Sequence, residues 1–149
     1  MKSPYFSVKE LVCKHVYERY GENAAMFLDD KLIETLNVIR EQILCAPMTV
    51  NNWHAGGNFT QRGLRCNICE LVKSKTDAGS LYLSAHMLGK AVDCNVEGMT
   101  AEEARRLIIA KQELLPYPIR LEDGVSWLHF DLYKCKIAGS SIKNRLSFL

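Results

Sequence analysis

The chain has 149 residues, a length that suits a single domain over residues 1–149 with its own hydrophobic core. Its formal net charge is +2 at pH 7, and no basic stripe is interleaved with aromatic residues, so we expect no nucleic-acid partner. No apolar run approaches the roughly 20 residues of a membrane span, and residues 1–6 lack the apolar stretch of a secretion signal. We expect a monomer that is cytoplasmic at synthesis.

Two helices are predicted before residue 47. Ser7 can cap the first helix, because Glu10 three residues later completes a capping box. Asp29 or Asp30 can cap the second helix. The apolar side chains of this second helix recur at spacings of four, three and four and form one stripe: Leu32, Leu36, Ile39 and Ile43. We expect that stripe to pack in the core.

The middle of the chain contains a strand and two loops. Residues 47–51 are a predicted strand, and the pair Gly56–Gly57 marks a loop. Residues 65–83 have no clean apolar periodicity and contain several polar side chains. We predict that this stretch is a mobile loop beside the functional site.

A third helix and a hairpin follow. Thr100 and Glu103 form a second capping box, and the helix ends before Pro116. The pair Asp123–Gly124 predicts a hairpin turn between two strands. This order of elements is typical of an α+β domain, with helices against one face of a small, mainly antiparallel sheet and the other face open.

Two segments alternate between apolar and polar side chains, residues 91–96 and 127–132. Such alternation is typical of half-buried strands, whose successive side chains point to opposite faces of a sheet. If both apolar sets face the core of one sheet, three polar side chains share its other surface: Asp93, His129 and Asp131. His86 lies just before the first segment, near a glycine that permits close approach of the backbone.

These polar side chains predict a metal site. Imidazole nitrogens from His86 and His129, with a carboxylate oxygen, are the donors that a catalytic zinc ion takes when one coordination position stays open for water. A lone histidine in a strand is more often a structural residue than a ligand. The chain, however, has only four histidines, and two of them lie in separate polar-faced strands or at their edges. We therefore predict one bound Zn²⁺ ion.

The residues of these segments resemble a known family. The pattern SxHxxGxAxD at residues 84–93, followed by WxHxD at residues 127–131, is similar to the zinc-dependent peptidoglycan peptidases of family M15. That family includes D-alanyl-D-alanine carboxypeptidases, dipeptidases and many phage endolysins. Residues 51–65 also resemble the upstream part of its small, phage-type members, so the resemblance covers most of the chain. It implies the fold shared with the hedgehog signalling domain, with the zinc site on the open face of the sheet.

The resemblance also implies roles for individual residues. The implied zinc ligands are His86, Asp93 and His129. Arg65 is similar to the family arginine that lies near the substrate carboxylate or the developing oxyanion, and we expect Ser84 and Trp127 to contact substrate. The implied reaction is hydrolysis of amide bonds in peptidoglycan stem peptides or cross-links, by a carboxypeptidase or an endopeptidase. A phage or prophage lysin of this kind needs a holin or a similar route to the cell wall.

The sequence departs from this family at the residue for proton transfer. Members often carry a glutamate three residues before the last zinc histidine, and here that position is Ser126. Three nearby carboxylates are candidates for the general base, in this order: Glu122, Asp131 and Asp123. The departure favours an alternative function, a cell-wall or peptide-binding module that retains zinc without catalysis.

The order of these candidates depends on the predicted hairpin. Asp123–Gly124 favours a two-residue type I′ turn, which pairs Glu122 with Val125 and puts Glu122 on the same side as His129. The weakness of this ranking is distance, because Val125 and His129 are roughly 13 Å apart along the strand. Only a wider turn or a bulge would bring Glu122 to the metal. Asp131 is nearer, but it can instead orient a ligand histidine. Asp123 ranks last because it is the first residue of the turn, a position that favours Asp for structural reasons.

The chain has six cysteines, but without a secretion signal we expect no disulfides. Cys66 and Cys69 form a single CxxC, which is a weak signal for zinc or for redox chemistry in the absence of a second such pair. The alternatives are a second metal, a disulfide or redox pair, and two reduced structural thiols. We expect the last of these.

Overall fold

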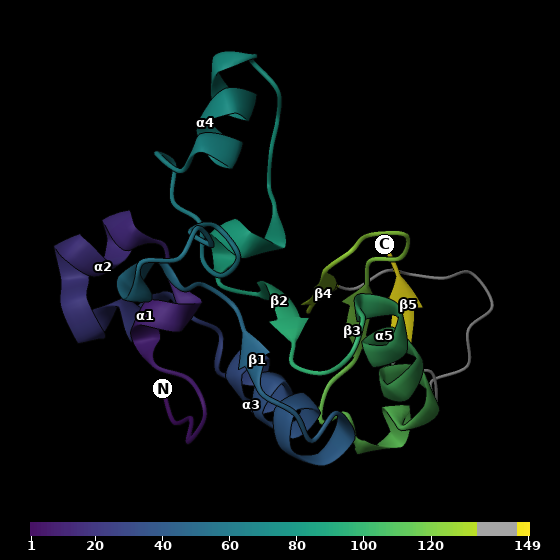
Figure 1. Cartoon of the computed structure of the whole chain (residues 1–149). Coiled ribbons are helices and arrows are strands. Elements are labelled where there is room, and N and C mark those ends of the chain that lie inside the picture. Colours follow the sequence, from purple (N-terminus) through teal and green to yellow (C-terminus); the bar gives the residue numbers. More distant parts are fainter. Residues whose placement is uncertain (134–145) are drawn as a thin grey trace.

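The computed structural model describes residues 1–133 and 146–149. Within these residues the chain forms an α+β fold with a five-stranded sheet in the order β1-β2-β4-β3-β5 (Figure 1). The strands are β1 (Met48–Thr49), β2 (Ala91–Val96), β3 (Ile119–Leu121), β4 (Leu128–Asp131) and β5 (Leu146–Phe148). Neighbours are antiparallel except β3 and β5, which are parallel. The predicted α+β class with a mainly antiparallel sheet is confirmed.

Three of the helices begin where the sequence predicts their caps. The α-helices of the described residues are α1 (Val8–Leu11), α2 (Lys14–Tyr20), α3 (Asp30–Val38), α4 (Glu70–Asp77) and α5 (Ala101–Ala110). Short 3-10 turns lie at Gly21–Phe27, Trp53–Ala55, Ala85–Leu88 and Gln112–Leu114, and a π-helical turn at Ile39–Ile43 extends α3. Ser7 and Thr100 form the predicted capping boxes of α1 and α5. Asp29 caps α3 by accepting a hydrogen bond from the backbone N–H of Lys31.

The hydrophobic core gathers side chains from the helices and from one face of the sheet. The apolar stripe of α3 and its extension is buried, as predicted: Leu32, Leu36, Ile39 and Ile43. Val92 and Phe130 join this core from β2 and β4, and Ile108 joins it from α5. Asp93 and His129 alternate with these apolar residues and therefore lie on the opposite face of the central strands.

Residues 65–83 are not the predicted mobile loop, because they contain helix α4. This helix stands away from the sheet (Figure 1), and Val72 is its one buried residue. A helix that buries a single side chain shows no apolar stripe, which explains why periodicity does not reveal it. The available signal is charge spacing, since Lys73 and Asp77 form an ion pair four residues apart on its exposed side.

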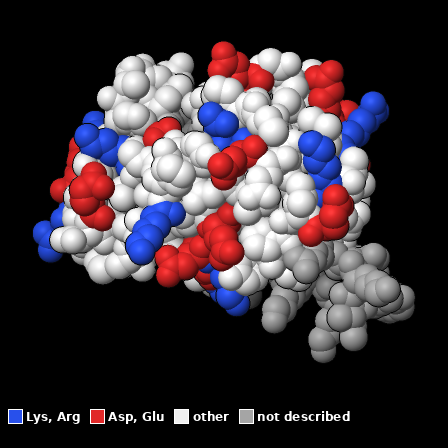
Figure 2. Space-filling model, turned by 90° about the horizontal axis from the view of Figure 1, so that it is seen from below, with Lys and Arg blue, Asp and Glu red and all other residues white. Residues whose placement is uncertain are grey.

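Charged side chains of both signs are interspersed on the face of the molecule shown in Figure 2. Several exposed ion pairs join neighbours on one helix, such as Lys14 with Glu18, and pairs of this kind add little stability. Among the residues with described structure, no helix has both the length and the apolar character needed to cross a membrane.

Candidate metal centre

Three buried side chains meet on the polar face of the sheet: His86, Asp93 and His129. Asp93 on β2 lies directly opposite His129 on β4 in the antiparallel register. His86 belongs to the helical turn that precedes β2. Asp93 Oδ1 lies 2.7 Å from His129 Nδ1, and Asp93 Oδ2 lies 3.3 Å from His86 Nε2. The fold thus brings together the two imidazoles and the carboxylate that the motifs single out.

Local structure holds His86 in this place. The side chain of Ser84 caps the turn by accepting a hydrogen bond from the backbone N–H of His86. Gly89 ends the turn at a φ of 65°, a left-handed conformation that favours glycine. A Cβ at Gly89 would also collide with the carbonyl oxygen of Phe27. The glycine of the motif is therefore required by both conformation and space.

Each imidazole is held from its outer side. His86 Nδ1 lies 2.9 Å from the carbonyl oxygen of Gly63, and His129 Nε2 lies 3.0 Å from Asp131 Oδ2. A ring N–H that donates to such an acceptor fixes the tautomer and leaves the other nitrogen as a lone-pair donor. The remaining nitrogens, His86 Nε2 and His129 Nδ1, both face Asp93. This arrangement is typical of ligand histidines, so the donor set fits a zinc ion.

Asp131 lies behind His129, and its carboxylate is engaged on several sides. Arg120 donates to both oxygens, from Nε to Oδ1 at 2.9 Å and from Nη2 to Oδ2 at 2.8 Å. The backbone N–H of Tyr133 donates to Oδ1 as well. Burial raises the pKa of Asp131, but the hydrogen bonds with His129 and Arg120 outweigh it, and the pKa is lowered. Asp131 is thus suited to orienting His129 rather than to accepting a proton.

The ionisation of the three central groups follows from the same contacts. Burial lowers the pKa of His129, but hydrogen bonds with Asp131 and Asp93 outweigh it and raise the pKa to about 9. Burial raises the pKa of Asp93, but hydrogen bonds from His129 and His86 hold that pKa below its ordinary value. For His86 burial dominates, and its pKa is lowered. The two carboxylates therefore favour a protonated His129 when no metal is bound, and a metal ion at Nδ1 would have to displace that proton.

Arg65 lies beside Asp93 in the wall of a cavity of about 440 Å³. One of its terminal nitrogens is 3.0 Å from Asp93 Oδ2, and its guanidinium also donates to the carbonyl oxygen of Gln61 and to the hydroxyl of Tyr82. Its side chain is 10% exposed, so it is not a surface residue. The same cavity is lined by the other residues that we expected at the site: Ser84, Glu122, Trp127 and Asp131.

The predicted two-residue turn at Asp123–Gly124 is wrong. Leu121 pairs with Phe130, and the backbone N–H of Glu122 donates to the carbonyl oxygen of His129 at 3.3 Å. The loop between β3 and β4 is therefore wider than two residues. Glu122 lies opposite His129 instead of Val125, and so it is closer to the candidate ligands than the predicted register allows.

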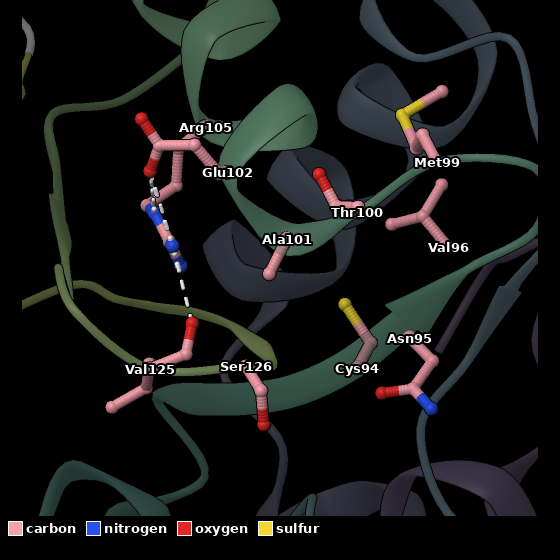
Figure 3. A pocket seen from close by; sticks show the side chains of 10 residues that line it. All are labelled: Cys94, Asn95, Val96, Met99, Thr100, Ala101, Glu102, Arg105, Val125 and Ser126. Atoms are coloured by element: carbon pink, nitrogen blue, oxygen red, sulfur yellow. Dashed lines mark hydrogen bonds and ion pairs between the residues drawn. The ribbon is translucent and has the colours of Figure 1, made fainter.

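A buried arginine explains the wider loop. Arg105 of α5 donates to the backbone carbonyl oxygens of Glu122, Val125 and Trp127. Figure 3 shows its guanidinium between Glu102 and the carbonyl of Val125. A tight turn would leave this guanidinium without those acceptors. Tertiary contacts therefore override the local preference of the Asp–Gly pair.

Ser126 and Asp123 lie outside the cavity beside His129. Ser126 lines a separate cavity of about 400 Å³ between the end of β2 and the start of α5 (Figure 3). Asp123 is exposed, and its carboxylate lies 3.7 Å from Arg105. Of the three carboxylates that are candidates for the general base, Glu122 and Asp131 line the same cavity as the candidate ligands His86, Asp93 and His129.

A second group of side chains could also hold a metal ion: Cys13, His15, Cys66 and Cys69. Within the described part of the chain, this group and the His86 group are the two that qualify. The CxxC is the part of this group that stands out in the sequence. A further signal in the sequence is the Cys-x-His pair at residues 13–15, which with the CxxC gives four side chains of the kinds that bind zinc.

Comparison with protein-family models, with curated proteins and with solved structures finds no match to this chain.

Proposed function

We propose that this protein is a zinc-dependent peptidase that hydrolyses amide bonds in peptidoglycan stem peptides or cross-links. One observation carries the proposal: His86 and His129 each turn one ring nitrogen toward Asp93, while an acceptor holds the other nitrogen. The resemblance of the surrounding motifs to peptidoglycan peptidases supports the substrate class.

Three protein ligands beside a cavity are typical of a catalytic zinc site rather than a structural one. When bound, zinc would supply a water nucleophile at neutral pH and polarise the scissile carbonyl. The contribution of the chain is to orient the ligands, to hold the substrate and to transfer protons. Asp131 and Gly63 serve the first of these tasks, because they fix the two imidazole rings.

Glu122 is our candidate for the general base. Residues paired across antiparallel strands have Cβ atoms about 4.5–5.5 Å apart, and Glu122 lies opposite His129. Its half-buried side chain lines the same cavity. It can accept the proton of the nucleophilic water and return it to the leaving amine. Asp131 is the weaker candidate, because Arg120 already occupies both of its oxygens.

Arg65 and Trp127 lie where two cavities meet. The cavity beside His86 and a second one of about 300 Å³ share Arg65, Asp93 and Trp127 in their walls. The shared wall offers an extended peptide two neighbouring cavities, which supports an endopeptidase over an enzyme that requires a free chain end. The guanidinium of Arg65 is placed to stabilise an oxyanion or a substrate carboxylate.

The test uses the full-length, zinc-loaded protein and purified peptidoglycan, with new amines and released peptides identified by mass spectrometry. We expect cleavage by the wild type and by His54→Ala, which alters an exposed histidine outside the site, and none by His86→Ala. Release of stem peptides from cross-linked material, with free stem peptides left intact, would identify an endopeptidase. Absence of any new amine with the zinc-loaded wild type would overturn the proposal.

The second candidate function is a module that binds zinc and cell-wall peptides without catalysis. The observation that favours it is Ser126, which replaces the usual family glutamate and lines a different cavity. Such a module would sediment with peptidoglycan and bind zinc, yet release no amine. Comparing binding and turnover of the same zinc-loaded sample separates the two functions.

A further inference from the structure

The cluster of Cys13, His15, Cys66 and Cys69 has the dimensions of a zinc site. The sulfur atoms of Cys66 and Cys69 are 3.8 Å apart, and His15 Nδ1 lies 3.5 Å from the first and 3.8 Å from the second. With Cys13, all four ligand atoms lie within 4.8 Å of one another. Zn–S bonds of about 2.3 Å at tetrahedral angles separate two sulfur atoms by about 3.8 Å. The distances within the cluster therefore match the edges of a tetrahedral site.

Backbone pairing brings the two ligand pairs together from distant parts of the chain. Cys13 donates its N–H to the carbonyl oxygen of Leu64 at 3.0 Å, and Leu64 donates to that of Leu11 at 2.8 Å. Gly63 permits this approach, because a Cβ there would overlap the carbonyl group of Leu11. Cys13 then precedes α2, whose first turn carries His15. Backbone hydrogen bonds therefore bring the two ligand pairs together, without any need for contact between the sulfur atoms.

Neither a disulfide nor a set of buried core thiols fits the cluster as well as a metal site does. A disulfide needs sulfur atoms about 2.05 Å apart, and Cys66 and Cys69 are at 3.8 Å, with all the cysteines of the described chain free. Cys13 and Cys69 are buried in the hydrophobic core, but core packing alone does not account for the imidazole beside them. Here His15, which is exposed, turns a ring nitrogen toward two of the sulfur atoms.

Helix α4 supplies a reason for a metal at this place. The segment that contains it is held by little apolar burial, since Val72 is buried but Leu71, Leu81 and Leu83 are exposed. Cys69 is the residue directly before the helix. A metal bound there would fasten the base of α4 with coordination bonds in place of a hydrophobic contact.

We infer that Cys13, His15, Cys66 and Cys69 bind a structural zinc ion that fastens α4 to the start of α2. Three thiolates and one imidazole fill the four positions of a tetrahedral ion, which is typical of structural zinc sites. Because Cys66 directly follows Arg65, the same ion also fixes the segment that places Arg65 against Asp93. The inference is independent of the proposed peptidase activity.

Metal content tests the inference in the full-length protein purified without chelator. We expect two zinc ions per chain in the wild type, one in His86→Ala and one in the double variant Cys66→Ser, Cys69→Ser. Cys45→Ser is the matched control, because Cys45 is exposed and lies outside the cluster, and it should retain two ions. If the double cysteine variant loses an ion but His86→Ala keeps the zinc content of the wild type, zinc binding by the His86 group is refuted. Zinc binding by the cysteine cluster is then supported.

Cobalt substitution of the wild type provides a test that requires no variant to fold. Thiolate ligands give an intense sulfur-to-cobalt charge-transfer absorption in the near ultraviolet, which a site of two histidines and an aspartate cannot give. We expect this absorption in the wild type and in His86→Ala, and its loss in the double cysteine variant. A cobalt-loaded wild type without it would overturn the inference. So would thiols that react with a disulfide reagent equally fast with and without zinc.

Discussion

Neighbouring groups assign different tasks to the three carboxylates around the candidate metal centre. Asp93 faces both histidines. Asp131 lies behind His129 and accepts two hydrogen bonds from Arg120. Glu122 lines the cavity from the opposite strand. These differences predict that conservative amide substitutions at two of these positions have distinct consequences.

Asp131→Asn should weaken zinc binding without abolishing it. The substitution keeps the shape of the side chain but removes the charge that orients His129, and loss of such an outer partner typically lowers metal affinity about 10–100-fold. Competition with a chromophoric chelator measures the change. Asp123→Asn, which alters an exposed carboxylate of the neighbouring loop, is the control and should bind zinc as the wild type does.

Glu122→Gln should lose about 10²–10⁴-fold in turnover while zinc content stays unchanged, because a proton-transfer residue contributes that much to the rate. Steady-state rates of amine release, with zinc measured in the same sample, check this. A Glu122→Gln variant with full activity would reject this assignment. If Asp131→Asn then loses turnover at saturating zinc, the general base is Asp131.

Arg65→Lys should lower kcat/KM about tenfold to a hundredfold although the charge is kept. Lysine cannot reproduce the planar fork that reaches Asp93 and its other acceptors at once, and a hydrogen bond to a charged group contributes about 1.5–3 kcal/mol. The control is Lys75→Arg, the reverse substitution at an exposed position of α4, which should leave kcat/KM unchanged. Unchanged kcat/KM in Arg65→Lys would remove this residue from the reaction.

The sequence predicts the residues whose placement follows from alternation along one strand. Asp93, His129 and Asp131 share a face for that reason alone. The sequence leaves two tasks open for Asp131, general base or orientation of His129, because the choice depends on Arg120, which reaches it only through the β3–β4 register. Cys13 and His15 were missed because their partners, Cys66 and Cys69, lie far away in the sequence.

Local signals predict the starts of the three capped helices, α1, α3 and α5, but not the connection between β3 and β4. A capping box depends on residues three apart, so Thr100 and Glu103 suffice to place the start of α5. The width of the loop after β3 depends instead on Arg105 of that helix, which binds three of its carbonyl groups. Strand β5 was not predicted either, since its pairing with β3 is parallel and has no local turn signal.

Arg105→Met should destabilise the protein by about 2–4 kcal/mol, since carbonyl groups of the loop lose a buried donor. Urea unfolding of the zinc-loaded protein measures the effect. Arg106→Met on the same helix is the matched control, because this side chain is 75% exposed, and its change should stay within about 0.5 kcal/mol. Equal stability of the two variants would show that the loop does not depend on Arg105.

For the whole molecule, the two proposed zinc sites differ in their ligands and should therefore respond differently to a chelator. The His86 group lines an open cavity and has three protein ligands, whereas the cysteine cluster has four. A chelator titration should therefore first remove the ion of the His86 group, with loss of activity and little change in Tm.

Removal of the ion of the cysteine cluster should lower Tm by roughly 8–16 °C. Zinc at a thousandfold excess over its Kd contributes about 4 kcal/mol, and each kcal/mol corresponds to about 2–4 °C in a domain of this size. Zinc content, amine release and thermal unfolding are followed on the same samples. Simultaneous loss of both ions, or activity in zinc-free protein, would contradict this order.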